Sequence, residues 1–261
     1  MHTSTATTEI MLASWYTDQG SFRSRNEDCC FVDLDLGVFM VADGVGGHAG
    51  GDIASRIATD EFADQLQRLL SSDFELSIGA IEACVCRAIR AAQYKYAGFA
   101  VADFSLKKMA CCLAFAVAKG GHLYYGRIGD CRVYTYQDGQ LRLLLNDESY
   151  VQELVDRNLL SVAEAKTSHL RHLITNCLSQ STPCALSVYH QPLVPGTQVI
   201  LTTDGVSDFL ERDDFSQTLD ACDRSEAAKQ LVDKALLNGS RDNLTCITLE
   251  YALNFVEQDS I

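Results

Sequence analysis

A change of hydrophobic period divides this chain into groups of short strands separated by long helices. From position 52 onward apolar residues recur on one helical stripe, with charged residues opposite, and a second such stripe follows. The stripes consist of Ile53, Ile57, Phe62, Leu66 and Leu69, then Ile78, Ile81, Val85, Ile89 and Ala92. Long helices between groups of antiparallel strands predict an α+β fold, a β-sandwich with helices on its faces.

The strands of this fold are expected where apolar and polar residues alternate, or where short apolar runs end at turn residues. These parts of the chain are 11–20, 29–44, 111–145, 198–203 and 243–253. A further helix is expected over 225–239, because the amphipathic pattern ends there at Gly239. The polar segment 148–182 is expected to be helical or irregular.

Nothing in the sequence resembles a linker between domains. The 261 residues include only 3 prolines, and no Gly/Ser-rich stretch interrupts the pattern. We therefore expect a single domain over 11–253, with a flexible N-terminus at 1–10 and a C-terminal tail at 254–261.

The net charge of −14 argues against a nucleic-acid partner, which requires a basic face that neutralises phosphates. An anionic substrate would also be repelled at long range, and a bound metal ion is the obvious way to reverse the field locally. No apolar run approaches the length of a membrane span, and the N-terminus lacks a signal pattern. No C-x-x-C pair occurs among the eleven cysteines, and most of them are expected as small buried residues in a reducing compartment. We therefore expect a cytoplasmic protein, and a monomer.

Acidic residues occupy the junctions where several expected strands begin or end. These junctions are Glu27-Asp28, Asp43-Gly44, Gly129-Asp130, Asp204-Gly205 and Asp242-Asn243. Each pair alone is ordinary turn chemistry. Together they fit a site in which oxygen atoms hold hard divalent ions, with glycine allowing a backbone carbonyl to approach as a further ligand. Hydrophobic periodicity does not show that the junctions converge in space.

Five ordered motifs between Arg23 and Thr245 carry a resemblance to a known family. They read SFRSRNEDCCFVDL, FMVADGVGGHAGGDIAS, YYGRIGDCRVY, VILTTDGVSD and GSRDNLT. The chain resembles the PPM-type, metal-dependent Ser/Thr protein phosphatases of the type 2C family, in the compact form of the stand-alone bacterial members. The resemblance implies two packed antiparallel β-sheets flanked by pairs of α-helices, in agreement with the fold expected from the residues.

The resemblance also implies a role for each acidic position. Asp43 would bridge two Mg²⁺ or Mn²⁺ ions, and the Gly44 carbonyl would be a ligand of one of them. Asp204 and Asp242 would complete the first ion's ligands. Asp130 would help to hold a third, weaker ion together with Asp204.

Four further residues have implied roles next to the ions. Asp28 and Glu27 would act mostly through ordered waters, with Asn243 beside them as a supporting group. Arg23 would bind the substrate phosphate through a bidentate, charge-assisted contact.

The reaction implied by this site is hydrolysis of phosphoserine and phosphothreonine in proteins. Such a group carries close to two negative charges, which repel an attacking hydroxide. Two ions about 3.5–4 Å apart can lower the pKa of a water between them and neutralise the charge that builds on the phosphoryl oxygens. No Ser or Cys nucleophile is required, and the enzyme would oppose a Ser/Thr kinase in a bacterial cytoplasm.

Three alternatives differ in function class. A pseudophosphatase would keep the fold and bind a phosphopeptide or partner, but every acidic position is filled and Arg23 is present. A hydrolase of a small phosphorylated metabolite stays open, because metals recognise the phosphate and not what carries it. A structural Ca²⁺ module is disfavoured, since no D-x-[DN]-x-[DN]-G loop occurs.

Several positions depart from the family pattern. Val45 stands where a histidine often follows the Asp-Gly pair, and we expect His48 to be a loop residue without a catalytic role. The sequence NDES at 146–149 replaces the usual Asp-His-Ser, which changes local hydrogen bonding but no metal ligand. The segment 150–182 matches the family's mobile flap in place and length, and His169 and His172 within it are expected at the surface.

Cysteines replace other residues near the expected site. Cys131 follows Asp130 where serine is usual, and Cys111-Cys112 stand in the sequence MACC, where Met-Gly-Thr-Thr or similar is usual. We expect volume-conserving replacement in strands. The alternative is redox sensitivity, if the metals lower the pKa of a thiol.

Overall fold

The computed structural model describes residues 5–45, 50–72, 76–180 and 183–257. It contains two antiparallel β-sheets packed face to face, as the sequence predicts. The first sheet has the strand order β1 (Thr5–Asp18), β11 (Leu244–Glu257), β10 (Gln198–Thr202), β6 (Arg132–Gln137), β7 (Gln140–Leu143). The second has the order β2 (Asp28–Asp33), β3 (Val38–Gly44), β4 (Ala110–Lys119), β5 (His122–Ile128), β9 (Tyr189–Pro192), and β8 (Leu178–Ser179) pairs with β4.

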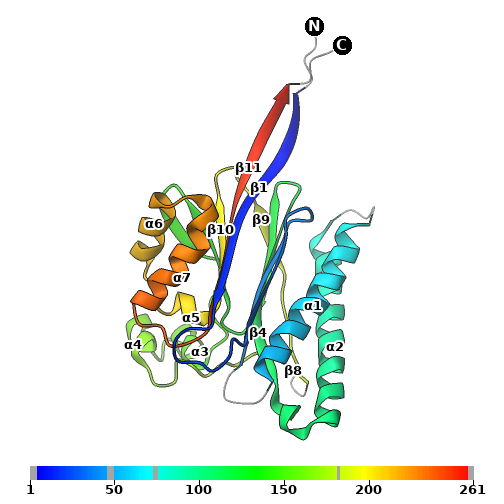
Figure 1. Ribbon diagram of the computed structural model, residues 1–261, viewed down its shortest axis with the longest axis vertical. Helices are drawn as coiled ribbons and strands as arrows, with labels where there is room; N and C mark the ends of the chain where they lie inside the picture. Colours follow the sequence, from blue (N-terminus) through cyan, green and yellow to red (C-terminus); the bar gives the residue numbers. More distant parts are fainter. Residues whose placement is uncertain (1–4, 46–49, 73–75, 181–182, 258–261) are drawn as a thin grey trace.

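Helices cover the outer face of each sheet (Figure 1). The second sheet is covered by α1 (Gly51–Leu70) and α2 (Ile78–Ala102), and the first by α6 (Arg212–Ala221) and α7 (Ala227–Leu237). Shorter elements connect them: the helices α3 (Tyr150–Asp156), α4 (Val162–Thr167) and α5 (Asp204–Ser207), and the 3₁₀ turns η1 (Phe104–Lys108) and η2 (Arg224–Glu226). None of the helices in the described ranges has the length and apolar character needed to cross a bilayer.

The alternation of side chains along β3 explains why both of its faces are apolar. Val38, Met40 and Ala42 join the cluster that α1 and α2 cover, whereas Phe39 and Val41 point into the space between the sheets. Strands whose two faces are both buried read as continuous apolar runs, as this one does. β3 is therefore held rigidly along its whole length up to Asp43.

A long ribbon of β1 and β11 projects from the body of the molecule (Figure 1). The two strands pair continuously from Thr5 opposite Glu257 to Asp18 opposite Leu244. The expected strand start at Met11 is therefore too late, and the expected end of the last strand at 253 is too early, because the ladder continues beyond both. Hydrogen bonding between the two strands extends each beyond the part whose apolar pattern predicts it.

Candidate functional site

Each of the five acidic junctions contributes at least one residue to the wall of one pocket of about 430 Å³. The pocket is lined mainly by polar groups that come from loops and strand ends: Arg23, Glu27, Asp43, Gly44, Val45, Asp130, His172, Ile174, Asp204, Asp242 and Asn243. The remaining predicted residue, Asp28, lies directly opposite Asp43 in the β2–β3 pair. The fold thus gathers residues that are up to 220 positions apart in the chain, counting from Arg23 to Asn243.

Two strand pairings place the carboxylates at the centre of this group. Asp28 is the first residue of β2 and Asp43 the next-to-last residue of β3, so their side chains start from neighbouring backbones. The hydroxyl of Thr203, just after β10, donates to Asp28 Oδ2 at 2.9 Å. This bond connects the end of β10 in one sheet with the start of β2 in the other.

Asp204 and Asp242 approach from the first sheet. Asp204 begins α5, separated from β10 by Thr203 alone, and Asp242 is separated from β11 by Asn243 alone. The guanidinium of Arg23 donates through Nη2 to Asp242 Oδ2 at 2.5 Å. Arg23, the one positively charged side chain predicted for the site, therefore pairs with one of the site's carboxylates.

Close backbone contact at Gly44 brings the start of α1 against the end of β3. A Cβ at Gly44 would lie 2.5 Å from the Gly51 backbone, and one at Gly51 would lie 2.6 Å from Glu27 Oε2. Side chains at these two positions would push the helix away from the pocket. The glycines predicted to free the backbone thus also let the Glu27 carboxylate reach the pocket.

Crowding raises the pKa values of the pocket's carboxylates. Burial is the largest cause for Asp43 and Asp204, and the neighbouring carboxylates add to it, so both pKa values lie well above their usual range. Burial raises the pKa of Asp28 to about 7, and the pKa values of Asp130 and Glu27 are also raised, again mainly by burial. Like charges brought this close need either protons or cations to balance them.

The donor set fits a hard divalent ion. Buried carboxylate oxygens without any hydrogen-bond partner occur at Asp28 Oδ1, Asp130 Oδ1 and Asp204 Oδ1. Such oxygens are costly unless a ligand satisfies them, and oxygen ligands are those that Mg²⁺ and Mn²⁺ prefer. Within the described ranges no three Asp, Glu, His or Cys side chains enclose an ion by themselves. Any ion here would therefore take water or backbone carbonyls among its ligands.

A comparison with models of protein families identifies the family of this chain. The family model described as "Protein phosphatase 2C" matches residues 23–238, which is most of its length. The chain belongs to the protein phosphatase 2C family. The match begins at Arg23 and includes the first four of the five acidic junctions, and Asp242-Asn243 follow it.

Relatives of this phosphatase 2C chain are found in several bacteria. It is 28% identical over 234 residues to "Serine/threonine protein phosphatase PstP" of Mycobacterium tuberculosis, a match that covers 90% of this chain and 44% of the relative. The chain therefore spans less than half the length of that relative. It is 26% identical over 254 residues to "Serine/threonine phosphatase stp" of Listeria monocytogenes, covering 96% of this chain and all of the relative.

Solved structures of family members share the fold. The M. tuberculosis PstP/Ppp structure superimposes with a TM-score of 0.82 at 26% identity and covers 92% of this chain and 98% of the other. The catalytic domain of PstP, solved in complex with two manganese ions, gives a TM-score of 0.81 at 26% identity, with coverage of 94% and 100%. The predicted two-sheet architecture is thus confirmed.

The turn that carries Asp130 is held by a network that the sequence did not reveal. Gly129 has a φ of +86°, and its N–H donates to Glu148 Oε2 at 2.9 Å. The same Glu148 oxygen accepts from Asn176 Nδ2 at 2.8 Å and faces Arg127 Nη1 at 3.4 Å. Glu148 stands where the family usually has histidine, and this departure was the available signal. It joins the end of the 150–182 segment to the turn before Asp130.

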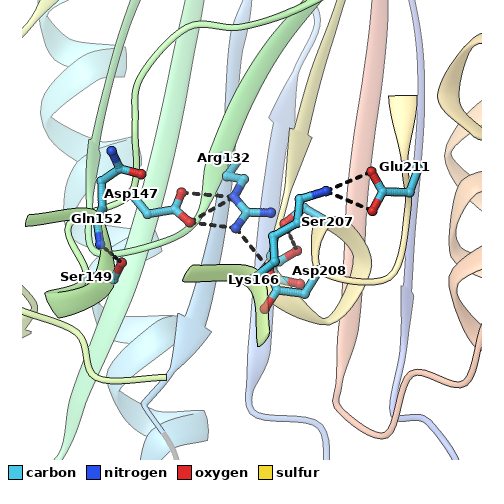
Figure 2. Close-up of polar contacts among 9 residues, drawn as sticks. Arg132, Asp147, Ser149, Gln152, Lys166, Ser207, Asp208 and Glu211 are labelled. Carbon is cyan, nitrogen blue, oxygen red and sulfur yellow. Dashed lines mark hydrogen bonds and ion pairs between the residues drawn. The ribbon is translucent and has the colours of Figure 1, made fainter. Parts of the chain in front are cut away.

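Arg132, two residues after Asp130, connects Asp147 with Asp208 (Figure 2). Its guanidinium donates to Asp147 through Nε and Nη2 at 2.6–3.1 Å and to Asp208 through Nη2 at 2.8 Å. Figure 2 also shows Lys166 of α4 paired with Glu211 at the start of α6, with both nitrogen–oxygen distances 2.9 Å. The 150–182 segment is therefore anchored to the domain at both Glu148 and Glu211.

We predict that Glu148→Ala lowers the free energy of unfolding by about 1–2 kcal/mol, because Gly129 N–H, Asn176 and Arg127 lose a shared acceptor. Glu148→Gln keeps an acceptor oxygen and should lose less. Chemical denaturation measures both. The matched control Glu153→Ala breaks only an exposed pair with Arg157 and should change the value by less than about 0.5 kcal/mol. Equal losses in the three variants would contradict the network's role.

Some predicted residues have surroundings that the sequence did not indicate. Asn243 is buried, and its side chain accepts from Glu27 N and donates to the carbonyls of Gln19 and Arg25, so it fixes the loop that carries Glu27. His172 is exposed, as expected, yet it lines the pocket. Val45 also lines the pocket, while His48 lies outside the described residues.

The cysteines near the site are buried and poorly ionised. Cys111, Cys112 and Cys131 have no exposed surface. Burial raises the pKa of the Cys111 thiol to about 12, and burial beside the acidic side chains raises the pKa values of Cys112 and Cys131 well above normal. A raised pKa opposes thiolate formation. The buried surroundings therefore favour the interpretation that these cysteines are volume-conserving replacements over the interpretation that they are redox-sensitive.

Proposed function

We propose that the chain hydrolyses phosphoserine and phosphothreonine in proteins, with Mn²⁺ or Mg²⁺ as cofactor. The observation that carries this proposal is the pocket in which all five acidic strand junctions meet beside Arg23, with Asp28 paired opposite Asp43. The two manganese ions of the PstP catalytic domain support the choice of cofactor. We expect two core ions in the site and a third ion that binds more weakly.

The proposed ligands follow the position of each group around the pocket. Asp43 lies between Asp28 of its own sheet and Asp204 of the other, which suits a residue that bridges two ions. Asp242 and the Gly44 carbonyl would complete this centre. Asp28 and Glu27 would act largely through water, Asn243 would hold the Glu27 loop, and Asp130 with Asp204 would hold the third ion.

When bound, the ions would activate a water as nucleophile and offset charge on the phosphoryl group. The protein's own residues provide the rest. Arg23 would turn from Asp242 to the substrate phosphate, because cations on the carboxylates remove the partner that it has now. Val45 and Ile174 form an apolar part of the wall, which limits water around the reacting group.

The proposed partner is a phosphoprotein, including a Ser/Thr kinase or its targets. The net charge of −14 supports a protein substrate over nucleic acid. We propose a monomer in the cytoplasm, where the eleven cysteines, all free among the described residues, would remain reduced.

Metal removal tests the proposed function. Turnover of p-nitrophenyl phosphate should vanish in EDTA and return with Mn²⁺ or Mg²⁺. Zn²⁺ and Ca²⁺ should support little activity, because the proposed ligands are all oxygen atoms, with no His or Cys among them. Full activity in EDTA after dialysis would contradict the proposal. Faster hydrolysis of sugar phosphates than of phosphopeptides would indicate a metabolite phosphatase, and phosphopeptide binding without turnover would indicate a pseudophosphatase.

A further inference from the structure

A second pocket of about 350 Å³ adjoins the carboxylate pocket. The two share Arg23, His172, Asp204 and Asp242 in their walls, so they are continuous. The second pocket alone is lined by Arg171, Gly205, Asp208, Phe209, Gly239 and Arg241. It therefore extends the site past Asp204 and Asp242, away from Asp43.

Among the described residues, two arginines on this pocket have no acidic partner. Arg171 comes from the 150–182 segment and Arg241 directly precedes Asp242, and both are exposed. In the part of the chain that the structure describes, neither guanidinium has an ion pair or a hydrogen bond. Arg241 lies over the ring of Phe22, 5.0 Å from its centroid, and Phe22 is itself 65% exposed. A guanidinium stacked in this way is held in place while its N–H groups stay free.

The carboxylates of the second pocket do not cancel these charges. Asp242 is paired with Arg23 at 2.5 Å, and Asp208 accepts at 2.8 Å from Arg132, which also pairs with Asp147. Asp204 belongs to the proposed metal ligands. With Asp204 assigned to the metal, Arg171 and Arg241 are the charged side chains of this pocket without a partner among the described residues, although the whole chain carries −14.

We propose that Arg171 and Arg241 form a second anion subsite, which binds a phosphate or carboxylate close in sequence to the phosphoresidue being hydrolysed. The inference rests on the proposed function, since that function places the first phosphate in the neighbouring pocket. An extended peptide advances about 3.3 Å per residue, so a second anion within three positions can enter the adjoining space. A phosphate binds more strongly than a carboxylate, because it carries nearly twice the charge and a third acceptor oxygen.

Peptides with one cleavable phosphothreonine test the subsite. A second position lies one, two or three residues before or after the phosphothreonine. It carries a non-hydrolysable phosphonate, an aspartate or an alanine. For the wild type, kcat/KM of the best phosphonate peptide should be about ten times that of the alanine peptide. For the aspartate peptide, kcat/KM should be about three times that of the alanine peptide. These ratios should shrink in high salt, because exposed charges are screened.

Variants show whether the two arginines are responsible. In Arg171→Ala/Arg241→Ala the phosphonate-to-alanine ratio should fall to about 1, and in Arg171→Lys/Arg241→Lys it should fall only in part. Arg90→Ala, which removes an exposed arginine on α2, should keep the wild-type ratio. A ratio near 1 in the wild type at every spacing, or a tenfold ratio in the double alanine variant, would overturn the proposal.

A binding measurement separates this inference from the proposed function. Peptides in which both groups are phosphonates should show the same ranking in fluorescence anisotropy, with the preference lost in the double alanine variant. If no peptide is hydrolysed but this ranking holds, the catalytic proposal fails and the subsite stands. If turnover is normal and the ranking is flat, the subsite fails alone.

Discussion

Asp43→Asn should abolish turnover and yet raise the melting temperature of the metal-free protein. Asp43 faces the charges of Asp204, Asp28 and Asp130, and each of them raises its pKa. Asparagine has similar size and removes that repulsion, so the folded state without metal should become more stable. The same change removes the proposed bridging ligand, and kcat should fall at least about 1,000-fold. Calorimetry in EDTA and phosphopeptide turnover in Mn²⁺ measure the two effects.

A substitution outside the pocket provides the control. Asp64→Asn on α1 removes an exposed carboxylate that pairs with Arg68, and it should leave turnover unchanged and shift the melting temperature by less than about 2 °C. If Asp43→Asn lowered the melting temperature in EDTA, the carboxylates would not be repelling one another. If it kept turnover, Asp43 would not hold a catalytic ion.

The metal-free protein should lose stability as the pH rises from 5 to 8. Carboxyl groups of an unfolded chain have pKa values near 4, whereas burial raises the pKa of Asp28 to about 7 and those of Asp43 and Asp204 well above the usual range. Between these values the folded chain binds protons that the unfolded chain has released, so the free energy of unfolding falls with pH. This stabilisation is complete below about pH 4 and disappears as the pH rises through the raised values.

Mn²⁺ should reverse this loss, because it replaces the protons. At about 100 times its dissociation constant a ligand adds about 2.7 kcal/mol, which for a chain of this size is on the order of 5–10 °C. The increase should be larger at pH 8 than at pH 5. Melting curves at both pH values, with EDTA and with Mn²⁺, measure it. A melting temperature that rises with pH in EDTA would contradict the assigned proton binding, and Asp43→Asn should show a shallower slope than the wild type.

The fold and the acidic residues could be predicted because they rest on local patterns. The stripe from Ile53 to Leu69 and the alternation around β3 are visible in any short window, and so is an aspartate that ends an apolar run. The extra strand length at Thr5 was missed, because pairing between β1 and β11 decides it and not the apolar content of either strand.

The surroundings of the acidic residues depend on topology and could not be predicted in the same way. Glu148 reaches the Asp130 turn only because β5 and β6 leave that turn open to the segment after β7. Arg171 and Arg241 lie 70 residues apart and meet at one pocket because the 150–182 segment lies against the loop before β11. No sequence period reports contacts of this kind between loops.

Calorimetric titration of Mn²⁺ into the metal-free protein tests most directly whether these carboxylates form a metal centre. At pH 7.5 the wild type should bind two ions per chain and release protons, because raised carboxyl pKa values leave protons for the metal to displace. Asp43→Asn should lose this binding, and Asp64→Asn should keep it. A wild-type titration without heat and without proton release, or equal binding by Asp43→Asn, would contradict the account.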